Sequence, residues 1–106
     1  MTKEQVMSVC NTYLRFITKA HPGHNWRPRV CTDDMMGLIL NPDLKHNGNN
    51  LTNELMEHLL YMCEQTIRFC ETDELEKAFR WLGFIQGAFW ILGIFSINDM
   101  RDQNTR

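Results

Sequence analysis

The chain has 106 residues, of which 43% are hydrophobic and 23% are charged, and its net charge at neutral pH is −2. This length predicts one domain over residues 1–106, and the composition is typical of a soluble globular protein. The small acidic net charge disfavours a nucleic-acid-binding protein. Because the glycine-rich and serine-centred motifs of common enzymes are absent from the sequence, we expect neither an enzyme nor a bound cofactor.

Charge and cysteine content give two further expectations. Residues 1–31 carry a net charge of +4 and residues 32–106 carry −6, so the two parts can complement each other within a fold or between subunits. The four cysteines form no closely spaced pair, which favours apolar thiols in the core of a reduced protein. The polar N-terminus is not a signal peptide, so we expect a cytoplasmic protein.

The first predicted element is a helix over residues 3–20. Thr2 and Gln5 have the spacing of a capping box, in which each side chain satisfies the backbone N–H of the other residue. The apolar positions that follow have helical spacing. They are Val6, Cys10, Tyr13, Leu14 and Ile17.

Residues 21–50 are predicted to be irregular, because Pro22, Gly23 and Pro28 exclude a regular helix from the first part of this segment. Two interpretations compete for residues 29–40. One is a small β-hairpin that turns at Asp33 and Asp34, and the other is a short helix. Turn-forming residues favour the hairpin.

Three more helices follow. The second, over 53–71, has Thr52 as its predicted N-cap, and the third, over 74–92, has Asp73 paired with Glu76. The short link predicts an antiparallel helical hairpin that packs with the first helix in a mainly α fold. Gly93 is the expected stop of the third helix, and Ser96 the cap of a fourth, over 97–102.

The most unusual segment is the apolar run over residues 81–95. A helix that is apolar all round must be enclosed by other protein or by lipid. Its length, the polar Gln86 and its three glycines disfavour a membrane span. A chain of this size has little other protein to enclose the helix, so we expect a homo-oligomer with this helix at or near the interface.

Within this helix, Gly83 and Gly87 lie four residues apart, a spacing that lets another backbone approach closely, either from the same chain or from a second subunit. Gln86 needs hydrogen-bond partners, which the core, a ligand or a second subunit can supply. Together with Trp90, these residues form the predicted oligomer interface.

A basic segment in the first half is a candidate anion-binding site. Arg27 and Arg29 offer planar donors for phosphate or carboxylate, Trp26 can stack on a base, and Lys19 lies nearby in sequence. The alternative is that the arginines pair with acidic residues of the later helices. Histidines 21 and 24 and Cys31 share this segment, but their spacing fits no common zinc module, so we expect no metal site.

Three segments carry a family resemblance: Arg80–Gly87, Ser96–Asp102 and His58–Gln65. They resemble uncharacterised small proteins encoded by tailed bacteriophages and prophages. The group has no named activity, so no functional residue carries over. The resemblance implies a small non-virion phage protein that acts in a bacterial cytoplasm by binding host or defence proteins. The alternatives are a binder of a small anionic ligand such as a nucleotide, and a membrane-associated regulator.

Overall fold

A computed structural model describes residues 1–20 and 48–105, and these residues form helices and no strand. The helices are α1 (Lys3–Ala20), α3 (Gly48–Glu71), α4 (Leu75–Ile91) and α5 (Ile97–Asn104). The predicted mainly α fold is therefore confirmed. The hairpin or short helix predicted over 29–40 lies outside the described residues.

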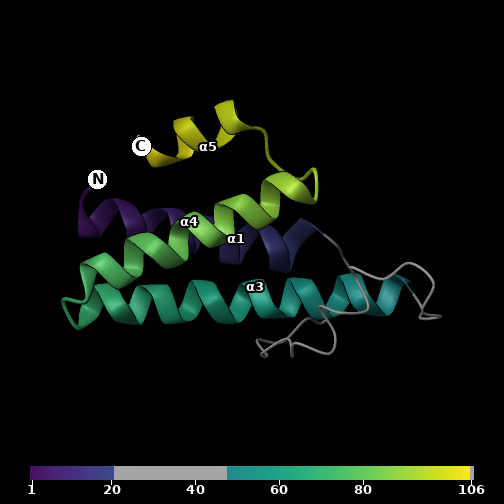
Figure 1. The fold of residues 1–106 in the computed structure, drawn as a ribbon, viewed down its shortest axis with the longest axis horizontal. Coiled ribbons are helices and arrows are strands. Elements are labelled where there is room, and N and C mark those ends of the chain that lie inside the picture. The colour runs from purple at the N-terminus through teal and green to yellow at the C-terminus, as the bar shows by residue number, and fades with distance from the viewer. Residues whose placement is uncertain (21–47, 106) are drawn as a thin grey trace.

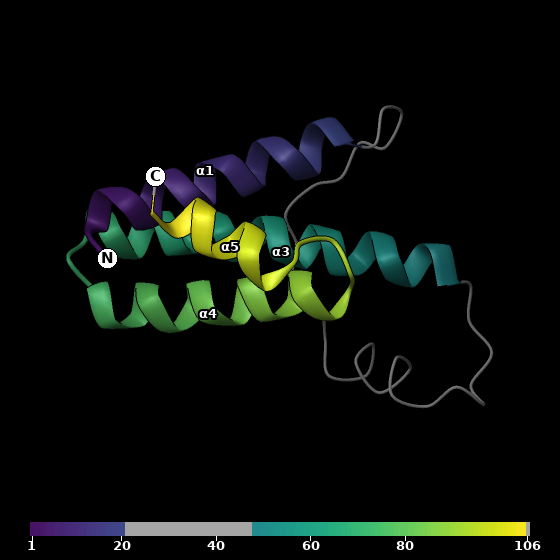
Figure 2. The same ribbon diagram turned by 90° about the horizontal axis from the view of Figure 1, so that it is seen from above.

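The helices α3 and α4 form the predicted antiparallel hairpin, and α1 packs against both of them. Figures 1 and 2 show that α3 and α5 lie on opposite sides of the layer formed by α1 and α4. Residues far apart in the sequence thus meet where α1, α4 and α5 adjoin.

The start and the buried face of α1 match the sequence prediction. Thr2 Oγ1 accepts a hydrogen bond from the Gln5 N–H at 3.1 Å, and Gln5 Oε1 accepts one from the Thr2 N–H at 2.7 Å. This reciprocal pair is the predicted capping box. The buried residues repeat every three or four positions, so they form one face of the helix. They are Val6, Val9, Cys10, Tyr13 and Ile17.

Helix α3 begins at Gly48, five residues before the predicted start, so the predicted Thr52 N-cap is wrong. The sequence GNN at 48–50 has low helix propensity, but it occupies the first turn, where the N–H groups lack intrahelical partners in any case. One face of α3 is buried in the bundle. It contains Met56, Leu59, Leu60, Met62, Cys63, Thr66 and Cys70.

The link between α3 and α4 differs from the prediction in one respect. The Glu74 N–H donates to the Phe69 carbonyl at 2.8 Å and the Asp73 N–H donates to the Cys70 carbonyl at 3.3 Å. This Schellman motif ends α3 and places Asp73 in the left-handed region, with φ of 60°. Asp73 therefore does not cap α4; the N-cap is Glu74, whose side chain makes no capping hydrogen bond.

The other two predicted helix signals are confirmed. Gly93 has φ of 72° and ends α4, with the Ile94 N–H donating to the Phe89 carbonyl at 2.9 Å. Ser96 and Asp99 form a capping box at the start of α5, with both hydrogen bonds at 3.0 Å. Helix α5 extends to Asn104, two residues beyond its predicted end.

The core joins α1, α3 and α4. Its cysteines at positions 10, 63 and 70 are buried free thiols, as predicted. A hydrogen bond with Cys10 and burial both raise the pKa of the Cys63 thiol. Toward the end of α4, the rings of Tyr13 and Phe89 lie 4.8 Å apart and those of Phe16 and Phe95 lie 4.9 Å apart. This aromatic cluster anchors the C-terminal part of α4 and the loop that follows it.

Candidate protein interface

Helix α4 buries only one of its faces. The buried residues are spaced by four, three and four positions, and they point toward α1 and α3. They are Ala78, Leu82, Ile85 and Phe89. The helices formed by residues 1–20 and 48–105 therefore do not enclose α4 all round.

The opposite side of α4 is apolar and exposed. Phe84, Trp90 and Ile91 are 58%, 55% and 79% exposed, respectively. By helical geometry, Gly83 and Gly87 lie in the middle of this side, with Trp90 on one edge and the other two large residues, Phe84 and Ile91, on the opposite edge. We call these five residues the outer face of α4.

Both glycines of the outer face border open space. Apart from the nearby backbone of α4 itself, a Cβ atom added at Gly83 or at Gly87 would meet no heavy atom of the described residues within 4 Å. Close packing against another described helix of the same chain therefore does not explain them. Approach by a second subunit, the other interpretation that the sequence left open, stays a prediction.

The size of the outer face distinguishes it from scattered surface residues. An aromatic side chain presents about 150–250 Å², so the three large side chains together expose roughly 300–400 Å² of apolar area at the fractions given above. The largest apolar patch on an ordinary monomer has about this size and is often functional.

Gln86, the fourth residue of the predicted interface, lies elsewhere on α4. Its amide nitrogen donates to the Tyr13 hydroxyl at 3.0 Å and to Asn104 Oδ1 at 2.6 Å, and its amide oxygen accepts from Asn104 Nδ2 at 3.3 Å. The Tyr13 hydroxyl donates in turn to Gln103 Oε1 at 2.6 Å. The structure thus places Gln86 in a polar network within its own chain, which joins α1, α4 and α5.

This network holds a titratable group in its neutral form. Burial raises the pKa of Tyr13 to about 12, and the hydrogen bond from Gln86 offsets part of that effect. Among the described residues, every buried side-chain polar atom has a hydrogen-bond partner. The network therefore joins α5 to the bundle, and it contains no buried polar atom without a partner.

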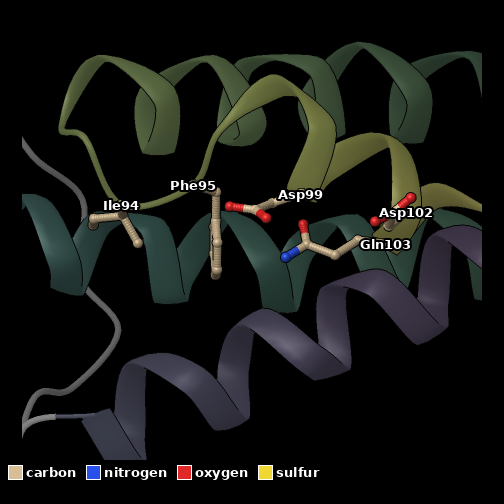
Figure 3. Close-up of a pocket in the computed structure, with 5 residues that line it drawn as sticks. All are labelled: Ile94, Phe95, Asp99, Asp102 and Gln103. Atoms are coloured by element: carbon tan, nitrogen blue, oxygen red, sulfur yellow. The ribbon is translucent and has the colours of Figure 1, made fainter.

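A hollow of about 310 Å³ lies beside this network, at the start of α5 (Figure 3). Ile94, Phe95, Asp99, Asp102 and Gln103 line it. The Asp99 carboxylate caps α5 and the Gln103 amide oxygen accepts the Tyr13 hydrogen bond, so two of its polar groups already serve the fold. We assign no binding role to it.

The predicted anion-binding residues are only partly placed. Lys19 lies exposed in the last turn of α1, beside a hollow of about 500 Å³ that Thr12, Arg15 and Phe16 also line. Residues 26, 27 and 29 lie outside the described part of the chain.

Two further predicted absences concern metals and membranes. No group of three potential metal ligands occurs among the described residues, and the candidate ligands His21, His24 and Cys31 lie outside them. None of the helices in the described part is both long and apolar enough to cross a membrane.

Comparisons with protein-family models, with curated proteins and with solved structures found no match to this chain. The site is therefore argued from its geometry. Sequence reasoning did not include Phe84 and Ile91 in the predicted interface. Periodicity does not reveal them, because nearly every position in the run over 81–95 is apolar.

Proposed function

We propose that this chain is a small protein-interaction module of the bacteriophage type, which acts as a homo-oligomer and binds and modulates a bacterial host or defence protein. The observation that supports the proposal is the outer face of α4, where three large apolar side chains surround two uncovered glycines. Such a face gives a marginally stable domain no advantage unless a partner covers it.

The energetics of the outer face favour self-association. Fully burying one large apolar side chain is worth about 1.5–3 kcal/mol. At the exposed fractions of Phe84, Trp90 and Ile91, one copy gains roughly 3–6 kcal/mol and a symmetric pair about twice that. This gain is comparable with the cost of association, about 4–15 kcal/mol, so packing around the face decides the affinity.

Light scattering and sedimentation at micromolar concentration test the self-association. We expect the wild type to be oligomeric and the double variant Phe84→Ser/Ile91→Ser to be a folded monomer. Ile97→Ser is the matched control, because Ile97 is 51% exposed but lies outside the outer face. A wild type that is monomeric at about 100 times that concentration would refute the self-association.

Binding to a bacterial protein needs a separate experiment. Immobilised wild type and the Ile97→Ser control should each retain the same protein from bacterial lysate. A titration with the purified partner should then give a saturable complex of defined stoichiometry. Failure of any lysate protein to bind saturably would contradict the host-binding part of the proposal.

One observation favours a second candidate, the binding of a small anion. Arg15 and Lys19 lie one turn apart beside the hollow on α1, with the ring of Phe16 next to them. Nucleotides should then raise the melting temperature, and Arg15→Ala/Lys19→Ala should remove the shift. If the shift instead persists in Arg15→Ala/Lys19→Ala and disappears in Arg27→Ala/Arg29→Ala, the basic segment is the site. If no nucleotide shifts the melting temperature of the wild type, this candidate is rejected.

A further inference from the structure

The outer face of α4 has a spacing that suits pairing with itself. Phe84 lies three residues before Gly87 and Ile91 lies four residues after it, so the two side chains flank the glycine by about one turn on each side. We infer that two copies pack α4 against α4 in an antiparallel pair, with a two-fold axis near Gly87. This inference rests on the proposed self-association and specifies its geometry.

A two-fold axis perpendicular to the helix makes the contacts reciprocal. Phe84 of one copy lies opposite Ile91 of the second copy, and Ile91 of the first lies opposite the second Phe84. Such an isologous contact uses one patch twice and closes after two subunits. The spacing therefore favours a dimer over an open chain of subunits.

Gly87 allows the two helices to approach closely where they cross. Helix axes in proteins usually lie about 8–10 Å apart, and the side chains at the contact set this distance. Beyond the nearby backbone of α4, a Cβ at Gly87 would meet no atom of the described residues within 4 Å, so the described part of the fold does not require glycine there. Glycine also costs about 1 kcal/mol of helix propensity relative to alanine, which a close helix contact compensates.

The charges along α4 favour the antiparallel orientation. The first half of the helix carries the exposed side chains of Glu76, Lys77 and Arg80 on the side that continues the outer face. A parallel pair would set Arg80 opposite its own copy, where like charges repel. An antiparallel pair moves each Arg80 toward the far end of the second α4, away from the Arg80 of the other copy. It also aligns the two helix dipoles favourably.

The apolar area is of the right size for this pairing. A standard interface buries about 800 Å² on each partner, of which about 57% is apolar. The outer face supplies roughly 300–400 Å² of that apolar area. To complete an interface of standard size, the two copies therefore need only a polar rim from the surface around the outer face.

The variant Gly87→Leu tests the crossing point. A leucine there has open space in the monomer and a higher helix propensity than glycine, so the melting temperature of the monomer should stay the same or rise. The dimer should dissociate at a protein concentration at least tenfold higher than for the wild type. Asn11→Leu, at an exposed position of α1, is the control and should keep the dimer.

Spin labels attached to Glu76→Cys test the orientation by electron paramagnetic resonance. In the antiparallel pair the two labels are 22 residues apart along the helix direction, which is about 33 Å. In a parallel pair they lie about 10 Å apart, the distance between the helices. Wild type treated with the same label reports any reaction of the native cysteines.

Each outcome has a distinct meaning. A dimer with a label distance near 33 Å that Gly87→Leu weakens supports the inference. A dimer with a short label distance, or one that Gly87→Leu leaves intact, overturns this geometry but keeps the proposed self-association. A monomeric wild type overturns both.

Discussion

Replacing Gln86 with methionine should measure how much the polar network contributes to stability. Methionine has nearly the same length and can keep the packing of the side chain, but it forms none of the amide's hydrogen bonds. Gln86→Met therefore removes three hydrogen bonds, two with Asn104 and one with Tyr13. These are the bonds that connect α4 to α1 and α5.

The size of the effect follows from what each partner retains. A hydrogen bond contributes a net 0.5–1.5 kcal/mol or so, and a stranded buried group costs about 1–3 kcal/mol. Tyr13 is buried but keeps its bond to Gln103, and Asn104 is half-exposed and can turn to water. We therefore expect the free energy of unfolding to fall by about 1–2 kcal/mol, at the lower end of the sum.

Urea denaturation at a fixed, low protein concentration measures this change. The control is Gln65→Met on α3, a half-buried glutamine outside the network, which should change the free energy of unfolding by less than about 0.5 kcal/mol. In a double-mutant cycle with Asn104→Ala, the two sites should couple by at least about 0.5 kcal/mol. If Gln86→Met unfolds like the wild type, the network does not stabilise the fold and the reasoning is refuted.

Three further predictions concern the turns and the buried tyrosine. Gly93→Ala should lower the free energy of unfolding by about 1–2 kcal/mol, because φ of 72° strains any side chain; an unchanged urea midpoint would contradict this. Asp73→Gly should raise the free energy of unfolding by about 0.5–1 kcal/mol, because glycine adopts φ of 60° without strain and the substitution loses only the exposed 3.3 Å ion pair with Lys3. Lys3→Ala measures the loss of that ion pair separately. Because the folded pKa of Tyr13 is about 12 and the unfolded one is near 10, the stability that its neutral hydroxyl contributes is complete below pH 10 and is lost between pH 10 and 12. The wild type should therefore lose stability relative to Tyr13→Phe over that range in urea titrations, and a constant difference would exclude a protonated buried phenol.

Local chemistry made most of the described fold predictable. The Thr2 and Ser96 caps and the Gly93 stop were predictable because each depends on residues within a few positions of one another. The prediction for Asp73 was wrong because one residue can serve either the end of one helix or the start of the next. In this link, the Schellman bonds that end α3 determine its conformation.

The candidate site was only half predictable, since it depends on how α4 is rotated in the bundle. The apolar run indicated that α4 needs more cover than a small chain provides, but nearly every position in it is apolar. Periodicity therefore could not separate the buried Ile85 from the exposed Phe84. The polar partners of Gln86 come from α1 and α5, 73 and 18 residues away in the chain, and no local pattern reveals them.

Gln86 also connects the fold to the proposed interface, because it fixes the rotation of α4. Its amide points to Tyr13 and Asn104, and helical geometry then directs Phe84 and Ile91 away from the bundle. Over residues 81–92 both sides of the helix are largely apolar, so the hydrophobic effect, which has no direction, separates the rotations only weakly there and directional hydrogen bonds help to select one. Gln86→Met should accordingly weaken the dimer as well as the fold, although Gln86 lies outside the outer face. A dimer that is unchanged in this variant would show that packing of the buried face alone orients α4.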